Sequence, residues 1–216
     1  METRPTYHAL IDSLSPAAYL VATRGADLSI PAGKAFAYLL GANGLYKYTV
    51  ARHFTVTIPI VSWERPLPGL GLIPAGFELR AGRIPGSLLD ACLAHAQRTG
   101  TQEVLYQFYI HGNRVSVTRP EQIGDRGSIQ YQTMEIDPAD IVLDLHSHHR
   151  MSAAFSAIDD RDEVGLRLYG VIGNIFQRPE ISLRIGFYGD FMRLPIWSAF
   201  AGPIRLVDRF QSERKQ

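Results

Sequence analysis

Hydrophobic and polar positions in the first third of the chain follow the spacing of β-strands. Apolar and aromatic residues over 17–23 and again over 36–61 predict short strands. The sequence GANG at 41–44 has the composition of a turn and would join two of them as a hairpin. We therefore expect a small β-rich N-terminal unit over residues 1–80.

Proline and glycine are concentrated in the next stretch, residues 62–86. Such a composition interrupts regular structure, so it predicts a connection between two units. The alternative is a long irregular loop within one domain. With the connection placed here, the second domain spans residues 81–216.

Helical and strand patterns are interleaved in this second domain. A helix is predicted within 85–100, strands within 103–117 and 139–149, a second helix over 156–170, and further strands over 170–195. The apolar run before the histidines of 139–149 is typical of a strand that is buried on both faces. This order predicts an α/β fold, a sandwich in which a mixed β-sheet is flanked by helices.

Composition and charge narrow the possible functions only slightly. The net charge of +1 gives no general electrostatic reason to bind nucleic acid or an anionic membrane. A single cysteine, Cys92, excludes an intramolecular disulfide, and its helical setting predicts a small core residue rather than a reactive thiol. Because we find neither a signal peptide nor a long apolar run, we expect a cytoplasmic protein.

Three of the seven histidines lie within four residues, at the end of the predicted strand 139–149. Side chains alternate along a strand, so His146 and His148 share a face and could bind one metal ion together. Asp159 follows eleven residues after His148, and a loop of that length can return to the end of the strand. Two imidazoles and one carboxylate leave a coordination position of zinc open, which is typical of catalytic sites.

Two further side chains could complete the chemistry of a hydrolase. Glu103, at the start of an apolar strand, is the candidate to take a proton from a zinc-bound water. Ser156 could donate a hydrogen bond to an oxyanion, a role worth about 3 kcal/mol in other enzymes. Each residue also has an ordinary explanation when taken singly. Ser156 and Asp159 match a capping box, Glu103 a solvated strand end, and His146 a core histidine.

The joint spacing resembles the JAMM motif of the JAB/MPN metalloprotease family. This motif reads His146, Ser147, His148, seven residues, Ser156, two residues and Asp159, with Glu103 in the place of the family's glutamate. The resemblance covers residues 85–195 and is greatest to the prokaryotic branch of the family. It implies a JAB/MPN-like, cytidine-deaminase-like sandwich, zinc ligands His146, His148 and Asp159, Glu103 as general base and acid, and Ser156 as oxyanion donor.

The resemblance also implies an activity and partners. Zinc enzymes of this family cleave peptide or isopeptide bonds, so the expected substrate is the C-terminus of a ubiquitin-like or sulfur-carrier protein. An activating-enzyme-like protein of the ThiF type is a further expected partner. The alternative is a JAB-fold scaffold that recruits protein partners without cleaving them. Since all five functional positions are filled, the hydrolase is the preferred interpretation.

Two positions depart from the family pattern, and one strand residue has two alternative roles. His149 stands where the family usually has proline, and we expect it at the rim of the site. Tyr106 stands where glycine is frequent. Both departures affect the expected shape of the substrate groove, and neither is a proposed metal ligand. Asp144 alternates onto the face of His146, where it could orient the imidazole or could be a structural strand carboxylate.

Overall fold

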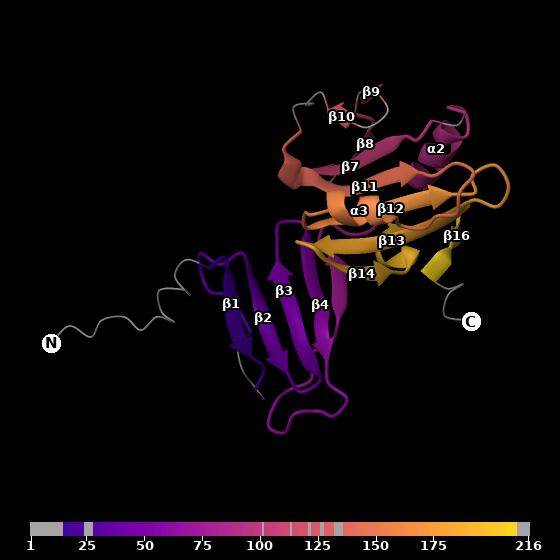
Figure 1. The fold of residues 1–216 in the computed structure, drawn as a ribbon. Coiled ribbons are helices and arrows are strands. Elements are labelled where there is room, and N and C mark those ends of the chain that lie inside the picture. The colour runs from indigo at the N-terminus through magenta and orange to yellow at the C-terminus, as the bar shows by residue number, and fades with distance from the viewer. Residues whose placement is uncertain are drawn as a thin grey trace. The chain divides into compact units, whose positions relative to one another are not determined.

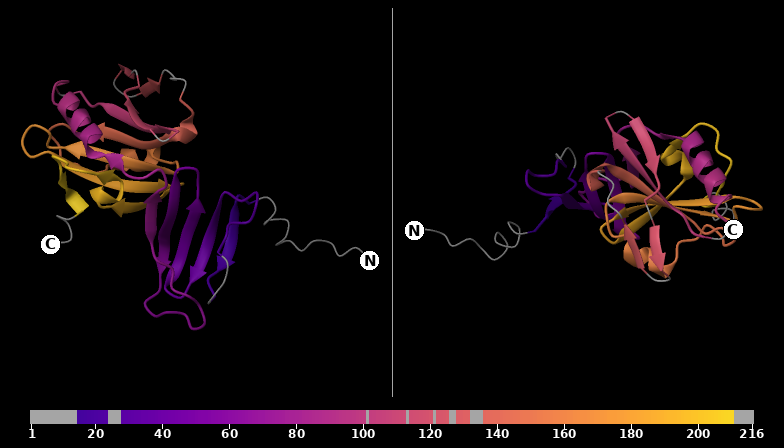
Figure 2. Two further views of the ribbon diagram at one scale, coloured as in Figure 1. Left: turned by 180° about the vertical axis from the view of Figure 1, so that it is seen from behind. Right: turned by 90° about the horizontal axis from the view of Figure 1, so that it is seen from above.

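The computed structural model describes residues 15–23, 28–100, 102–112, 114–120, 122–125, 128–131 and 136–210. The chain divides into two compact units, the first ending at Arg80 and the second beginning at Ala81 (Figure 1). Each unit is built on its own β-sheet, and Figure 2 shows both sheets from two further directions.

The first unit contains a five-stranded sheet in the order β1-β2-β3-β4-β5. Its strands are β1 (Ala17–Val21), β2 (Phe36–Gly41), β3 (Gly44–Val50), β4 (Phe54–Ser62) and β5 (Gly76–Leu79). The β1 and β2 strands are parallel, and the other neighbours are antiparallel. The predicted strands of this unit and the turn between Gly41 and Gly44 are confirmed.

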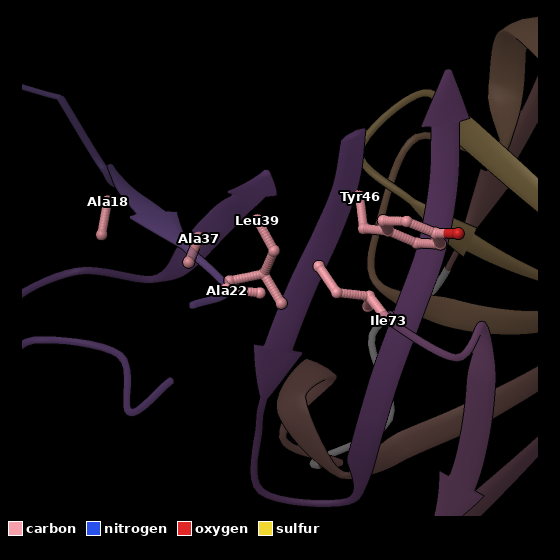
Figure 3. Close-up of a cluster of buried hydrophobic side chains, with 6 residues drawn as sticks. All are labelled: Ala18, Ala22, Ala37, Leu39, Tyr46 and Ile73. Carbon is pink, nitrogen blue, oxygen red and sulfur yellow. The ribbon is translucent and has the colours of Figure 1, made fainter. Parts of the chain in front are cut away.

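One face of this sheet carries a cluster of buried apolar side chains (Figure 3). Strand alternation brings Ala18, Ala37, Leu39 and Tyr46 to the same face, and Ile73 packs against them from the segment between β4 and β5.

That segment, residues 63–75, is not a linker. The Asn43 side chain donates to the carbonyl of Ile73 and accepts from its N–H, at 2.8 and 2.9 Å. The backbone N–H of Gly71 donates to the carbonyl of Ala22. Most of the stretch rich in proline and glycine is therefore an irregular loop packed into the first unit, and the division between the units comes after β5.

The second unit is built around a seven-stranded sheet, in the order β14-β13-β12-β11-β7-β8, with β16 paired to β13. Its strands are β7 (Leu105–His111), β8 (Arg114–Thr118), β11 (Ile141–Ser147), β12 (Arg167–Gly173), β13 (Glu180–Phe187), β14 (Asp190–Leu194) and β16 (Val207–Asp208). The pairs β11/β12 and β13/β16 are parallel, and the rest are antiparallel.

Short elements complete this unit. They are the strand pairs β6 (Ile84–Pro85) with β15 (Phe200–Ala201) and β9 (Gln122–Asp125) with β10 (Ser128–Tyr131), the 3-10 turns η1 (Pro138–Asp140) and η2 (Ile196–Ser198), and the helices α2 (Gly86–Ala96) and α3 (Ala157–Asp162). The α2 helix confirms the one predicted within 85–100. It buries Cys92, as expected, and burial raises the pKa of the Cys92 thiol to about 12.

The predicted α/β sandwich with helices flanking the sheet is wrong. The described residues form sixteen strands and just two α-helices, so the protein is predominantly β. The second predicted helix, over 156–170, ends at Asp162, and Arg167–Gly173 is the strand β12 instead. Six of the seven residues of β12 are buried, so both faces of the strand are covered and its apolar run has no alternation. A continuous apolar run of this kind does not distinguish a buried strand from a helix.

Glycine at position 170 fits the strand and not the helix. A Cβ atom there would lie 2.8 Å from Cδ1 of Leu145 on the neighbouring β11. Glycine also weakens a helix by about 1 kcal/mol relative to alanine.

Among the described segments, none is a helix with the length and apolarity that a bilayer span requires.

Candidate metal centre

Two imidazoles meet at the end of β11. His146 lies on the strand and His148 directly after it, so that the strand alternation directs both side chains to one side. Their Nε2 atoms are 3.1 Å apart, and their ring centroids are 4.8 Å apart. The expected pairing of His146 and His148 is thus present in the structure.

The third donor comes from the first turn of α3. Ser156 is the N-cap of this helix and forms a capping box with Asp159: the Ser156 hydroxyl accepts from the N–H of Asp159, and the Asp159 carboxylate accepts from the N–H of Ser156. The second of these bonds uses Oδ2 of Asp159. Its Oδ1 atom faces His146 Nε2 at 3.4 Å. Asp159 therefore does both: it forms the capping box with Ser156, and it lies close to the histidines.

This group of donors fits a metal ion. One ligand atom from each of His146, His148 and Asp159 lies within 4.8 Å of the others. Nitrogen and oxygen atoms bound to one zinc ion, each at about 2.0–2.2 Å, are separated by roughly 3–4 Å. A proton on His146 Nε2 could be shared with one of its two neighbours, whereas a metal ion could accept electron pairs from all three residues. His146, His148 and Asp159 could therefore hold a metal ion.

The charge states of these residues suit metal binding. Burial lowers the pKa of His146 to about 4, and the nearby Asp159 carboxylate only partly opposes this effect. Burial raises the pKa of Asp159, but its hydrogen bonds with Ser156 and the electrostatic effect of the two imidazoles outweigh burial, so its pKa is lowered overall. At neutral pH the site therefore offers an unprotonated imidazole and an ionised carboxylate, the forms that bind cations.

The loop after β11 fixes the ring of His148. The carbonyl of Ser152 lies 3.4 Å from His148 Nδ1. Because a carbonyl oxygen can only accept, this contact favours the tautomer with hydrogen on Nδ1 and leaves Nε2 with its electron pair. The backbone N–H of His148 donates to the carbonyl of Ile172 on β12 at 2.8 Å.

A cavity of about 570 Å³ opens beside the donors, and both His146 and Asp159 line it. Glu103 lines the same cavity, although it is not inside a strand as predicted: β7 begins at Leu105, and Glu103 is exposed just before it. The described residues that line the cavity do not include Ser156. The hydroxyl of Ser156 accepts the capping bond, and its proton is still able to donate.

Two charged residues of the cavity, Glu163 and Arg167, were not singled out in the sequence. Glu163, at the end of α3, lines the cavity, and burial raises the pKa of its carboxyl to about 7 against the attraction of the Arg184 guanidinium. Asp144 accepts from Arg167 Nη1 at 2.6 Å and from Gln107 Nε2 at 3.0 Å. It is therefore a structural carboxylate of the strand, the second of its two expected roles. No spacing in the sequence distinguishes Glu163 or Arg167 from ordinary surface charges.

The two departures from the JAMM pattern have structural roles. His149 is 4% exposed, so the prediction that it lies at the rim is wrong. Its backbone has a positive φ of 38°, and its Nδ1 lies 3.4 Å from the hydroxyl of Ser147. Tyr106 is buried on β7, and its hydroxyl lies 2.8 Å from Nδ1 of His95 on α2. Its side chain therefore connects the sheet to the helix.

Comparisons with known proteins do not assign the chain. It matches no protein-family model, and no curated protein matches its sequence. The interpretation of the site therefore rests on its own residues and their geometry.

Proposed function

We propose that this protein is a zinc-dependent hydrolase of the JAMM type. The observation that carries the proposal is the convergence of His146, His148 and Asp159 beside a cavity that Glu103 also lines. Two nitrogen donors and one carboxylate suit zinc and leave room for a further ligand. When bound, zinc polarises a carbonyl group and lowers the pKa of a water molecule that it holds to about 7.

In this proposal the substrate is the C-terminal peptide or isopeptide bond of a ubiquitin-like or sulfur-carrier protein. Glu103 takes the proton of the attacking water and passes it to the leaving amine. Its exposure at the wall of the cavity supports this role. Ser156 donates its hydroxyl proton to the oxygen that gains negative charge. An activating-enzyme-like protein of the ThiF type would prepare the same substrate.

Metal content tests the first half of this proposal. Elemental analysis of the full chain without an affinity tag should give one zinc per wild-type chain and none in His148→Ala. His111→Ala is the matched control, because His111 is exposed at the end of β7 and outside the donor group. Equal zinc in all three proteins, or none in the wild type after zinc is added, would contradict the metal centre.

Hydrolysis tests the second half. The probe is ubiquitin with a fluorogenic amide at its C-terminus, incubated with the zinc-loaded protein. Glu103→Gln should retain zinc and lose at least 100-fold in rate, a typical effect of removing a general base. Full activity in the zinc-loaded variant would remove Glu103 from the mechanism. Zinc binding without hydrolysis in the wild type would favour the non-catalytic scaffold.

A further inference from the structure

The helix that carries Asp159 has no hydrophobic anchor of its own. The α3 helix is six residues long, and none of these residues is buried. Helices of this length are not stable alone in water. Some other contact must therefore hold the carboxylate of Asp159 toward the histidines.

Arg184 provides that contact from the sheet. It lies on β13 and is 5% exposed. Its Nη1 donates to Oδ1 of Asp160 at 2.5 Å, and its Nε donates to Oε2 of Glu163 at 2.8 Å. Asp160 is the residue after Asp159, and the N–H of Glu163 donates to the carbonyl of Asp159 at 2.9 Å. One guanidinium thus binds residues at two positions along the helix, one adjacent to Asp159 and one hydrogen-bonded to it.

The same guanidinium also fixes the approach to the helix. Its Cζ lies 3.9 Å from the ring centroid of Phe155 and 3.9 Å from that of Phe191. Phe155 directly precedes the N-cap Ser156, and Phe191 lies on β14. Stacking between two rings restrains the plane of the guanidinium, which a lysine ammonium could not reproduce.

We propose that Arg184 is a positioning residue for Asp159 and thereby sets the metal affinity of the centre. None of these contacts of Arg184 involves a donor atom of the metal centre. It acts by holding Phe155, Asp160 and Glu163 on one side, so that the first turn of α3 presents Asp159 to the histidine pair. The proposal rests on the metal centre proposed above.

The experiment is a double-mutant cycle on zinc affinity, measured in the full chain by competition with a chromogenic chelator. Arg184→Lys keeps the charge and loses the planar fork. It should weaken zinc binding about 10- to 100-fold, as losses of outer contacts to metal ligands commonly do. In an Asp159→Ala background the same change should have no further effect, because the ligand that Arg184 positions is already gone.

Two additional variants make the result specific. Arg193→Lys is the matched control, because Arg193 pairs with Arg184 across β13 and β14 but is exposed, and its affinity should equal that of the wild type. Asp160→Asn removes the charge of one partner of Arg184, at an exposed side chain. It should weaken binding in the same direction as Arg184→Lys, and it gives this result even if Arg184→Lys folds poorly.

The outcomes separate this proposal from the metal centre itself. An unchanged affinity in Arg184→Lys and Asp160→Asn, with tight binding in the wild type, would overturn the positioning role alone. An equal loss with and without Asp159 would also overturn it, since the effect would then be general destabilisation. Absence of zinc binding in the wild type would overturn the centre on which it depends.

Discussion

Ser147 and Val104 hydrogen-bond to each other in both directions. The N–H of Ser147 donates to the carbonyl of Val104 at 3.1 Å, and the N–H of Val104 donates to the Ser147 hydroxyl at 3.0 Å. Ser147 is fully buried between His146 and His148, and Val104 follows Glu103. This pair therefore joins the strand that carries the histidines to the backbone that carries the proposed base.

Ser147→Ala should destabilise the protein by about 1–3 kcal/mol, because the buried N–H of Val104 loses its acceptor. Urea unfolding followed by circular dichroism measures this difference. If Glu103 is the base, the rate of hydrolysis should also fall while zinc is retained. Ser62→Ala, at an exposed strand end in the first unit, is the control and should change neither quantity. An unfolding midpoint equal to that of the wild type would contradict the role of this bond.

Gly173→Ala should displace the loop that orients His148. A Cβ atom at this position would lie 2.3 Å from the N atom of Ala153 and 2.5 Å from the carbonyl oxygen of Met151. These are backbone atoms that no side-chain rotation can move away. We expect a loss of about 1–3 kcal/mol from overpacking and at least a tenfold weaker affinity for zinc.

The control for this change is Gly76→Ala, since a Cβ atom there would meet no atom within 4 Å. Chelator competition and urea unfolding on both variants give the comparison. A Gly173→Ala protein that binds zinc as tightly as the wild type would show that the contact does not constrain His148.

The buried imidazole of His146 predicts a pH dependence for the metal-free protein. In the unfolded chain a histidine binds its proton near pH 6.5, whereas in the folded protein the pKa of His146 is lowered to about 4. Between these values the unfolded state binds more protons, so stability falls as the pH falls. The contribution lost from pH 6.5 to 4 is about 3 kcal/mol.

Urea unfolding in the presence of a chelator, at both ends of this pH range, measures the effect. Wild type should lose more stability than His146→Gln over the same interval, because the variant has no imidazole to protonate. Titrating groups that do not interact with His146 are common to both proteins and cancel in the difference, whereas Asp159, whose pKa His146 helps to lower, does not. Parallel losses in the two proteins would show that His146 accepts a proton readily in the folded state.

Cys92 should be inert in the native protein. Burial on α2 raises its pKa to about 12, so the reactive thiolate is scarce at neutral pH. A disulfide reagent should label the native chain at least about 100-fold more slowly than the urea-unfolded chain. Because it is the sole cysteine, the signal has one source. Equal labelling rates would contradict its burial.

The sequence predicts the local features of the site better than the fold that surrounds it. Alternation alone places His146 and His148 on one side of β11, and the capping pattern of Ser156 and Asp159 identifies the start of α3. Both are short-range regularities, fixed by backbone geometry over a few residues. The proximity of His146 and Asp159 is long-range. The length of the loop after His148 permits it, and the resemblance to a known motif favours it.

The errors arise where tertiary burial overrides local pattern. In β12, burial on both faces removes the alternation that identifies a strand, so the sequence predicts a helix that continues over the start of this strand. His149 is predicted at the rim, whereas it is buried in the turn after β11, with a positive φ. The contacts of Arg184 join β13 to a helix more than twenty residues earlier in the chain. The spacing of charged residues in the sequence does not predict them.

The unequal anchoring of the three donors has a consequence for exchange of the metal ion. The histidines belong to a strand paired on both sides, by β7 and β12, whose amide protons should exchange slowly with solvent. Asp159 belongs to a short helix without buried residues, which should open far more often. Local opening of α3 would withdraw one donor and leave the histidine pair in place. Metal ions could then enter and leave through fraying of this helix, while the sheet stays folded.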